Sequence, residues 1–259
     1  MFFDSHTHIN NESYTDAQRA ELIAAIEASD VSHVVDVGFD LESSAMAAEH
    51  ARKYPWCYAA AGFHPHNAKD TDEEALALIR GLARKDRVVA VGEIGLDYYR
   101  DISPRETQQY WFRRQIALAL ELGKPIIIHD RDANEDVLRI LKEEGVFRRA
   151  PAGLLMHCFS GSRELALRYV KLGAMISIAG PVTYKNARKA AEVAEAVPLD
   201  RLFIETDAPY LTPEPFRGKP NSSPLIVHTA AKVAEIKGIT TEELARATRE
   251  NALRFFGIA

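Results

Sequence analysis

The histidines of this sequence gather where short apolar segments end. Nine histidines are present, and six of them stand at or just beyond the end of such a segment. These six are His6, His8, His64, His66, His129 and His157. Two acids, Glu93 and Asp207, occupy similar places. Imidazole nitrogen and carboxylate oxygen suit Zn²⁺, Mn²⁺ and, less readily, Mg²⁺, so the pattern indicates a metal centre.

The segment DSHTH at 4–8 offers the first two ligands. Side chains two residues apart on a strand project from the same face, so His6 and His8 can face one ion. The alternative is a solvated strand end that holds two histidines by chance. The remaining candidates favour the metal site over this alternative.

Glu93 stands in an apolar run, where a lone carboxylate would be costly to desolvate. Its partner is either a metal ion or an arginine at the strand end. His129 follows three isoleucines and is either a ligand or a hydrogen-bonded core histidine. His157 and Asp207 end two further runs and are ambiguous singly. The convergence of all these residues on one edge favours ligation.

The proposed ligands, four imidazoles and two carboxylates, are too many for one catalytic ion that keeps a position open for water. A carboxylate can bridge two ions with its two oxygens. We therefore expect two divalent ions (Mg²⁺, Mn²⁺ or Zn²⁺) about 3.5–4 Å apart. Such a pair activates water and stabilises the attacking and leaving oxygens of a displacement, so the expected chemistry is hydrolysis.

Eight short runs rich in Val, Ile and Phe must position these residues. They span residues 2–8, 31–38, 58–64, 88–97, 125–130, 153–159, 174–180 and 202–207. Their nearly continuous apolar character is typical of parallel strands covered on the outer face. Helical patterns lie between them, and a break at 238–240 divides the final stretch, 225–256, into two helices. The pattern predicts a (β/α)8 TIM barrel with the metal site at the C-terminal ends of its strands, the alternative being an open doubly wound sheet.

Composition narrows the class of protein. The chain has 259 residues, 47% hydrophobic and 27% charged, which excludes a disordered protein. The formal net charge is −5, so no global basic field attracts nucleic acid. The chain has two cysteines, no signal-peptide pattern at its start and no apolar stretch of about 18 residues. We expect one cytoplasmic domain that does not enter a membrane.

Six motifs follow one another along essentially the whole chain: DSHTH at 4–8, GFHPH at 62–66, GEIGLDYY at 92–99, IHDRDA at 128–133, HCFSG at 157–161 and ETDAPYL at 205–211. Together they resemble the TatD family of metal-dependent deoxyribonucleases, a branch of the amidohydrolase-like barrels.

The resemblance implies a role for each site residue. His6 and His8 would bind the first metal ion, Glu93 would bridge, and His129 and His157 would hold the second. Asp207 would touch the first ion and take a proton from the attacking water. His64 would lie near the scissile phosphate, whereas His66 is as well explained by a loop-capping role.

Substrate contacts are expected from Arg131 and from the long loop 208–224, which contains Tyr210, Arg217 and Lys219. Basic side chains can hold phosphates while an aromatic ring stacks on a base. A proline-stiffened surface loop is the alternative. The loop also departs from the family pattern, because it reads GKPNSSP at 218–224 where the family commonly has a glutamate.

Two other features receive a structural interpretation. Cys158 is interpreted as a packing residue, because an alternating strand would point it away from the metal face. Lys185, Arg188 and Lys189 could meet phosphate, but they are interpreted as the solvated face of a helix.

The function that these patterns favour is a 3′–5′ exonuclease-like deoxyribonuclease, acting as a monomer on DNA. The main alternative is hydrolysis of another ester or amide, as in lactonases, amidases or D-aminoacyl-tRNA deacylases. Many amidase relatives use a carboxylated lysine as the bridge, and Glu93 stands in that place here. A seven-stranded polymerase-associated phosphoesterase and a non-enzymatic metal scaffold are further alternatives.

Overall fold

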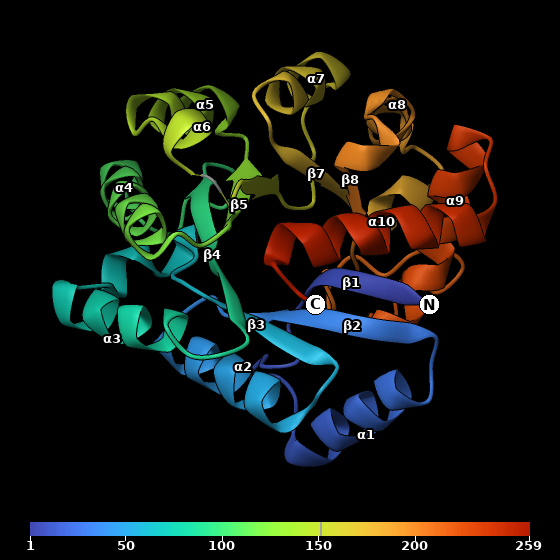
Figure 1. Cartoon of the computed structure of the whole chain (residues 1–259), viewed down its shortest axis with the longest axis horizontal. Coiled ribbons are helices and arrows are strands. Elements are labelled where there is room, and N and C mark those ends of the chain that lie inside the picture. The colour runs from blue at the N-terminus through green and yellow to red at the C-terminus, as the bar shows by residue number, and fades with distance from the viewer. Residues whose placement is uncertain (151) are drawn as a thin grey trace.

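A computed structural model describes residues 1–150 and 152–259. Eight parallel strands pair in chain order, each with its sequence neighbour (Figure 1). They are β1 (Phe2–Thr7), β2 (Val31–Val37), β3 (Cys57–Ala61), β4 (Val88–Asp97), β5 (Ile126–Arg131), β6 (Leu154–Met156), β7 (Met175–Ile178) and β8 (Leu202–Ile204). Every expected strand is present in this order.

The sheet closes where its last strand meets its first. An isolated parallel bridge joins Thr7 to Ala208. The amide of His8 donates to the Ala208 carbonyl at 2.8 Å, and the amide of Asp207 donates to the His6 carbonyl at 2.9 Å. The molecule is therefore a (β/α)8 barrel, and the open-sheet alternative is wrong.

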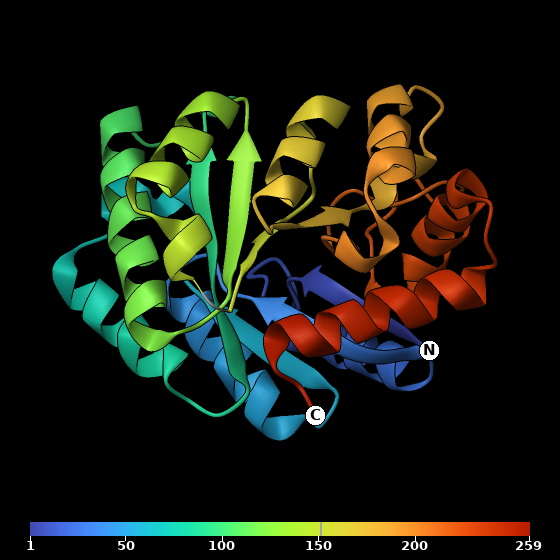
Figure 2. The same ribbon diagram turned by 45° about the horizontal axis from the view of Figure 1, so that its top comes forward.

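Helices surround the strands on the outside (Figures 1 and 2). They are α1 (Asp16–Glu27), α2 (Leu41–Lys53), α3 (Glu73–Ala83), α4 (Arg105–Leu122), α5 (Asn134–Glu143), α6 (Val146–Arg149), α7 (Arg163–Lys171), α8 (Arg188–Ala196), α9 (Ile226–Lys237) and α10 (Thr241–Phe256). The expected break in the final stretch is confirmed: Gly238 ends α9 in the left-handed conformation, and Thr240 begins α10 with a capping box to Glu243. No helix of the described residues has the length and apolarity needed to cross a membrane.

Strand alternation divides the core into two layers. Ile126 and Ile128 pack in the cluster between strands and helices, whereas Ile127 belongs to a second cluster inside the barrel. That inner cluster also contains Phe256 of α10, whose ring lies 5.9 Å from that of Phe3 between centroids. Aromatic side chains thus fill the end of the barrel opposite the strand tips, where Figure 2 places the C-terminus.

Four predicted strands extend too far at their C-terminal ends. Residues 58–64, 153–159, 174–180 and 202–207 were expected as strands, but β3, β6, β7 and β8 end at Ala61, Met156, Ile178 and Ile204. His64 instead caps a 3-10 helix, and Cys158 and Asp207 have positive φ values of 42° and 56°. The left-handed region is incompatible with an extended strand, so the chain turns into loops at the site.

Candidate metal centre

A cavity of about 500 Å³ opens at the C-terminal ends of the strands. Its wall contains most of the predicted site residues: His8, His64, Glu93, His129, Arg131, His157, Asp207 and Tyr210. His6 is fully buried, and its imidazole lies against His157 with 3.6 Å between ring centroids. The fold thus gathers residues from six strand ends into one place.

An irregularity in β4 aims Glu93 into this cavity. The pairing of β4 with β5 shifts register between Val91 and Ile94, and both of these side chains pack in the outer cluster. Unbroken alternation would place Glu93 on the same outer face as Val91. The bulge reverses the phase of the pleat, so the carboxylate points inward. Beyond it, Gly95 allows β5 to approach closely, because a Cβ there would lie 1.9 Å from the His129 carbonyl oxygen.

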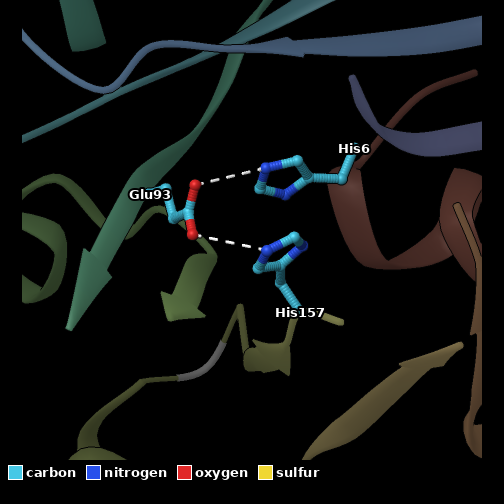
Figure 3. A group of neighbouring side chains, drawn as sticks. All are labelled: His6, Glu93 and His157. Atoms are coloured by element: carbon cyan, nitrogen blue, oxygen red, sulfur yellow. Dashed lines mark ion pairs between the residues drawn. The ribbon is translucent and has the colours of Figure 1, made fainter. Parts of the chain in front are cut away.

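The two carboxylate oxygens of Glu93 face different imidazoles (Figure 3). Oε2 lies 3.3 Å from Nε2 of His6, and Oε1 lies 3.3 Å from Nε2 of His157. Oε1 also lies 2.6 Å from Nδ1 of His129. Glu93 therefore stands between two groups of histidines, the geometry that a bridging ligand requires.

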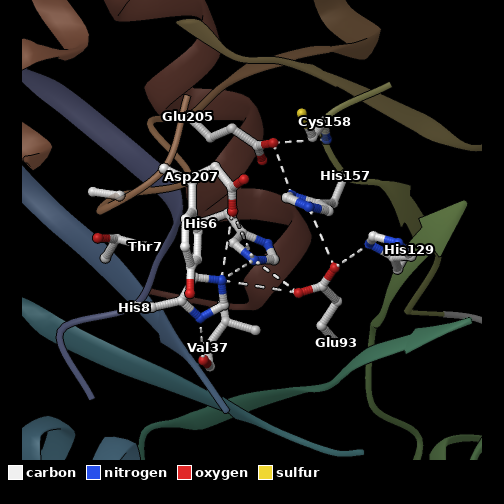
Figure 4. Close-up of polar contacts among 12 residues, drawn as sticks. His6, Thr7, His8, Val37, Glu93, His129, His157, Cys158, Glu205 and Asp207 are labelled. Atoms are coloured by element: carbon white, nitrogen blue, oxygen red, sulfur yellow. Dashed lines mark hydrogen bonds and ion pairs between the residues drawn. The ribbon is translucent and has the colours of Figure 1, made fainter. Parts of the chain in front are cut away.

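The first group comprises His6, His8 and Asp207 (Figure 4). Nε2 of His6 lies 3.2 Å from Nε2 of His8, and Oδ1 of Asp207 lies 3.5 Å from the latter atom. A register shift between Asp4 and Thr7 in β1 accompanies this inward placement. Two facing imidazole nitrogens beside two carboxylates match the donors that a divalent transition metal prefers.

Outer partners lie against the rings of His8 and His157 on the side away from Glu93. Nδ1 of His8 donates to the Val37 carbonyl at 2.7 Å. Nδ1 of His157 lies 2.8 Å from Oε1 of Glu205. In the neutral form of each ring, a proton held on the outer nitrogen leaves the inner nitrogen with a free lone pair for a cation. The residues present therefore fit bound divalent metal.

Asp97 is the outer partner of the His129 ring. Its Oδ2 lies 3.2 Å from Nε2 of His129, and its Oδ1 accepts hydrogen bonds from the backbone amides of Tyr99 and Arg100. Sequence reasoning missed Asp97 and Glu205 as outer partners. Their only signal was position, since each lies within a quoted motif that also contains a predicted ligand.

Mutual electrostatics compensate the burial of these groups. Burial alone would raise the pKa of Glu93, but His157 and other nearby imidazoles hold this pKa well below its ordinary value. Burial opposes protonation of His157 and His129. Their carboxylate neighbours, chiefly Glu205 and Asp97, nevertheless raise the pKa of His157 to about 10 and that of His129 to about 9. Without bound cations, protons on these imidazoles supply the compensating positive charge.

His64 and His66 differ in their surroundings. Nε2 of His64 lies 3.7 Å from Oε1 of Glu93, and its Nδ1 accepts the backbone amide of His66 at 3.1 Å. Nε2 of His66 instead lies 2.8 Å from Oδ2 of Asp97. His64 thus faces the centre and caps a turn, whereas His66 braces the outer carboxylate.

The structure does not bring the predicted substrate residues together in one place. Arg131 and Tyr210 line the metal cavity, and the Arg131 guanidinium lies 4.4 Å from the centre of the Tyr99 ring. Arg217 lines a neighbouring cavity. Lys219 lines neither of these cavities, and its Nζ lies 5.8 Å from the centre of the Phe216 ring.

The loop that lacks the family glutamate is held by Asn221. Its side-chain amide donates to the carbonyls of Thr206 at 2.8 Å and Tyr210 at 2.7 Å. The hydroxyl of Ser223 also lies 3.4 Å from that of Thr7. These contacts fasten the loop to β1 and to the segment after β8.

The interpretation of Cys158 rested on a strand that ends earlier. Cys158 lies beyond β6, and its backbone amide donates to Oε1 of Glu205 at 2.7 Å. Its sulfur, with His157 and Glu205, belongs to a further set of close potential ligand atoms. Burial raises the pKa of its thiol well above the ordinary value, so it is a weak ligand beside the imidazoles.

An eight-stranded barrel whose mouth gathers imidazoles around a shared carboxylate defines a class of metal-dependent hydrolases. Comparison with known families agrees: the model described as TatD related DNase matches residues 3–257. The chain belongs to the TatD family.

Individual relatives match over nearly their whole length. The chain is 49% identical to the uncharacterized metal-dependent hydrolase YabD of Bacillus subtilis, with 100% of both proteins covered. It is 35% identical to the 3′-5′ ssDNA/RNA exonuclease TatD of Cronobacter sakazakii, covering 98% of this chain and 97% of the relative. The crystal structure of YJJV, a TatD homologue from Escherichia coli, superposes with a TM-score of 0.91 at 31% identity, covering 100% and 98% of the two chains. The chain is thus a metal-dependent hydrolase with the fold of this family.

Proposed function

We propose that this protein is a deoxyribonuclease that releases nucleotides from the 3′ end of a DNA strand. The observation that carries the proposal is the position of Glu93, whose two oxygens face separate groups of imidazoles. A relative 35% identical to this chain is named a 3′-5′ ssDNA/RNA exonuclease, which supports the choice of substrate.

The chain offers ligands for two divalent ions. His6, His8 and Asp207 would hold one, and His129 and His157 the other, with Glu93 shared between them. When bound, such ions lower the pKa of a water molecule and stabilise the charge on a phosphate.

Asp207 is the proposed general base. Burial would raise the pKa of this carboxyl, but a hydrogen bond from His8 and the positive charge of His157 lower it. Asp207 is therefore ionised at neutral pH and can accept a proton from the attacking water.

His64 is the proposed donor to the scissile phosphate. Burial and the neighbouring His129 hold the pKa of His64 well below its ordinary value, so the ring is neutral. Because Nδ1 accepts the amide of His66, the ring proton lies on Nε2. An Nε2–H group can donate to a phosphate oxygen but cannot bind a cation, which favours this role over ligation. Arg131 and Tyr210, in the same cavity, are the proposed contacts to the substrate.

A substrate panel tests the proposal. Protein stripped of metal and reloaded with Mg²⁺, Mn²⁺ or Zn²⁺ would be given single-stranded DNA labelled at either end, a phosphodiester dye, a lactone and a D-aminoacyl-tRNA. We expect stepwise loss of nucleotides from the 3′ end and little hydrolysis of the last two substrates. Turnover of the lactone or the aminoacyl ester without DNA cleavage would overturn the nuclease in favour of the alternative ester substrate.

Asp207→Asn tests the proposed base. This isosteric change should leave at least one ion bound and lower kcat on DNA by about 10²–10⁴-fold. Elemental analysis of the variant separates loss of metal from loss of the base. Unchanged turnover would remove Asp207 from the mechanism.

A further inference from the structure

A second cavity lies beside the metal cavity. It measures about 770 Å³ and is walled by the segment from the end of β7 to the start of α8, by residues after β6 and by the loop after β8. A third cavity of about 370 Å³ adjoins both. It shares His157 and Asp207 with the metal cavity and Cys158 and Pro181 with the second one. Asp130, Arg131 and Asp132 also line it.

The second cavity, hereafter the basic cavity, has an apolar floor. Phe159, Ile178 and Val182 line it, and each is at least nine-tenths buried. Most of their surface is packed in the outer core cluster, so only the outermost atoms reach the cavity. The floor is therefore apolar and offers a base van der Waals contact without hydrogen bonds to particular base edges.

The rim of the basic cavity is cationic. Lys185, Arg188, Lys189 and Arg217 line it, against the single acidic residue Glu214. Arg188 is engaged by Glu192, but in the described part of the chain no ion pair involves Lys185, Lys189 or Arg217. Three exposed cations without carboxylate partners create a local positive field on a protein whose formal net charge is −5.

Arg217 is held in place for such a contact. Its guanidinium lies 4.4 Å from the centre of the Tyr184 ring. The Tyr184 hydroxyl donates in turn to the Thr212 carbonyl at 3.1 Å, which fixes the ring. A stacked guanidinium keeps its N–H groups free at the edge, where they can meet a phosphate.

We propose that the basic cavity binds the part of the polynucleotide strand next to the nucleotide being removed, with bases on the apolar floor and phosphates at Lys185, Lys189 and Arg217. This inference rests on the proposed nuclease function and specifies a polymeric substrate. A lactone or a small phosphoester fills the metal cavity alone and gains nothing from the basic cavity. An oligonucleotide spans both cavities, so only a substrate long enough to reach the basic cavity gains contacts with its rim.

The test compares substrates of different length. Lys185→Ala/Lys189→Ala/Arg217→Ala should lower kcat/KM about tenfold or more on single-stranded DNA of about 16 nucleotides. The same variant should match the wild type on a dinucleotide and on a phosphodiester dye. The control, Lys142→Ala/Lys171→Ala/Arg246→Ala, removes the same charge from exposed positions on α5, α7 and α10 and should leave both rates unchanged. Lys185→Ala/Lys189→Ala alone keeps the Arg217–Tyr184 stack and should show a smaller loss in the same direction.

Binding provides a second readout. Fluorescence anisotropy of the same DNA on Glu93→Ala protein, with and without the triple change, should show a slope of log affinity against log salt that is less steep by about 2 when three phosphate contacts are lost. An equal loss on long and short substrates, or an unchanged salt slope, would overturn the subsite while leaving the nuclease intact. A wild-type protein that cleaves no DNA would overturn the nuclease itself and the subsite with it.

Discussion

The two ends of the barrel are built from the same strands but differ in what they bury: apolar rings at one end and ionisable groups at the other. At the N-terminal end, Phe3, Phe203 and Phe256 fill the interior with stacked and edge-on rings. At the C-terminal mouth, the inward positions carry His6, Glu93 and other ionisable groups that are just as deeply buried. Apolar packing stabilises the first end directly. Burial of ionisable groups at the second end is possible only because each charge has a partner of opposite sign. The residues that stabilise the fold and the residues that could do chemistry therefore lie at opposite ends of the barrel axis.

Removing the shared carboxylate should have the largest effect. Glu93→Ala should abolish hydrolysis of every substrate and leave the fold intact, because it takes away the carboxylate whose two oxygens face both sets of histidines. Circular dichroism and elemental analysis would accompany the rate measurement. Glu121→Ala, an exposed carboxylate on α4, is the control. An active Glu93 variant with metal still bound would refute the bridge.

A substitution at the N-terminal end of the barrel should lower stability and leave turnover unchanged. Phe256→Ala should lower the free energy of unfolding by about 3–5 kcal/mol, because it opens a cavity in the inner cluster. Its kcat at low temperature should stay near the wild-type value. Leu78→Ala, at a side chain 53% exposed on α3, should change stability by less than about 0.5 kcal/mol. A Phe256 variant that unfolds normally but has lost turnover would contradict the division between the two ends.

Outer partners of the ligands should have intermediate effects. Asp97→Asn should weaken metal binding by about 10–100-fold, because His129 loses the carboxylate that orients its ring. Calorimetric titration of stripped protein with Mn²⁺ would measure this change. Asp101→Asn, an exposed carboxylate beside Arg105, should leave the affinity unchanged. Equal affinity in both variants would mean that Asp97 does not support the metal site.

The affinity of the protein for divalent metal should also depend on pH. The raised pKa values of His157, about 10, and His129, about 9, mean that both rings are protonated at neutral pH in the metal-free protein. A metal ion must displace these protons. Its apparent affinity should therefore rise with pH below about pH 9, by about tenfold per pH unit for each proton released. Titrations in two buffers of different ionisation enthalpy would count the protons. A pH-independent affinity without proton release would show that neither histidine is a ligand.

Regular alternation explains what could be predicted from the sequence. In β5, Ile127 faces the barrel interior, so His129 two residues later faces the mouth. The eight strands, their order and the gathering of histidines followed from similar patterns. The predicted substrate contacts stay predictions; they involve Arg131, Tyr210, Arg217 and Lys219.

Other features could not be predicted from the sequence, because they depend on backbone irregularities and on contacts between residues far apart in the chain. Glu93 was predicted as a ligand from its surroundings and its motif, but the register shift after Val91 that turns its side chain inward was not. That shift belongs to the pairing with β5, and unbroken alternation would have aimed Glu93 at the helices. Strand ends at β6 and β8 were placed too late because positive φ at Cys158 and Asp207 has no signature in hydrophobicity. Glu205 was missed because its partner, His157, is distant in sequence and becomes a neighbour only when the barrel forms.

The seam between β8 and β1 has a consequence for biosynthesis. The backbone bonds that join these strands belong to His6, His8, Asp207 and Ala208, so the last strand to be synthesised completes both the cylinder and the first group of ligands. A nascent polypeptide that has not yet received its eighth strand lacks Asp207, so the proposed metal centre cannot be complete in it. The complete set of proposed ligands therefore comes together only when the barrel closes.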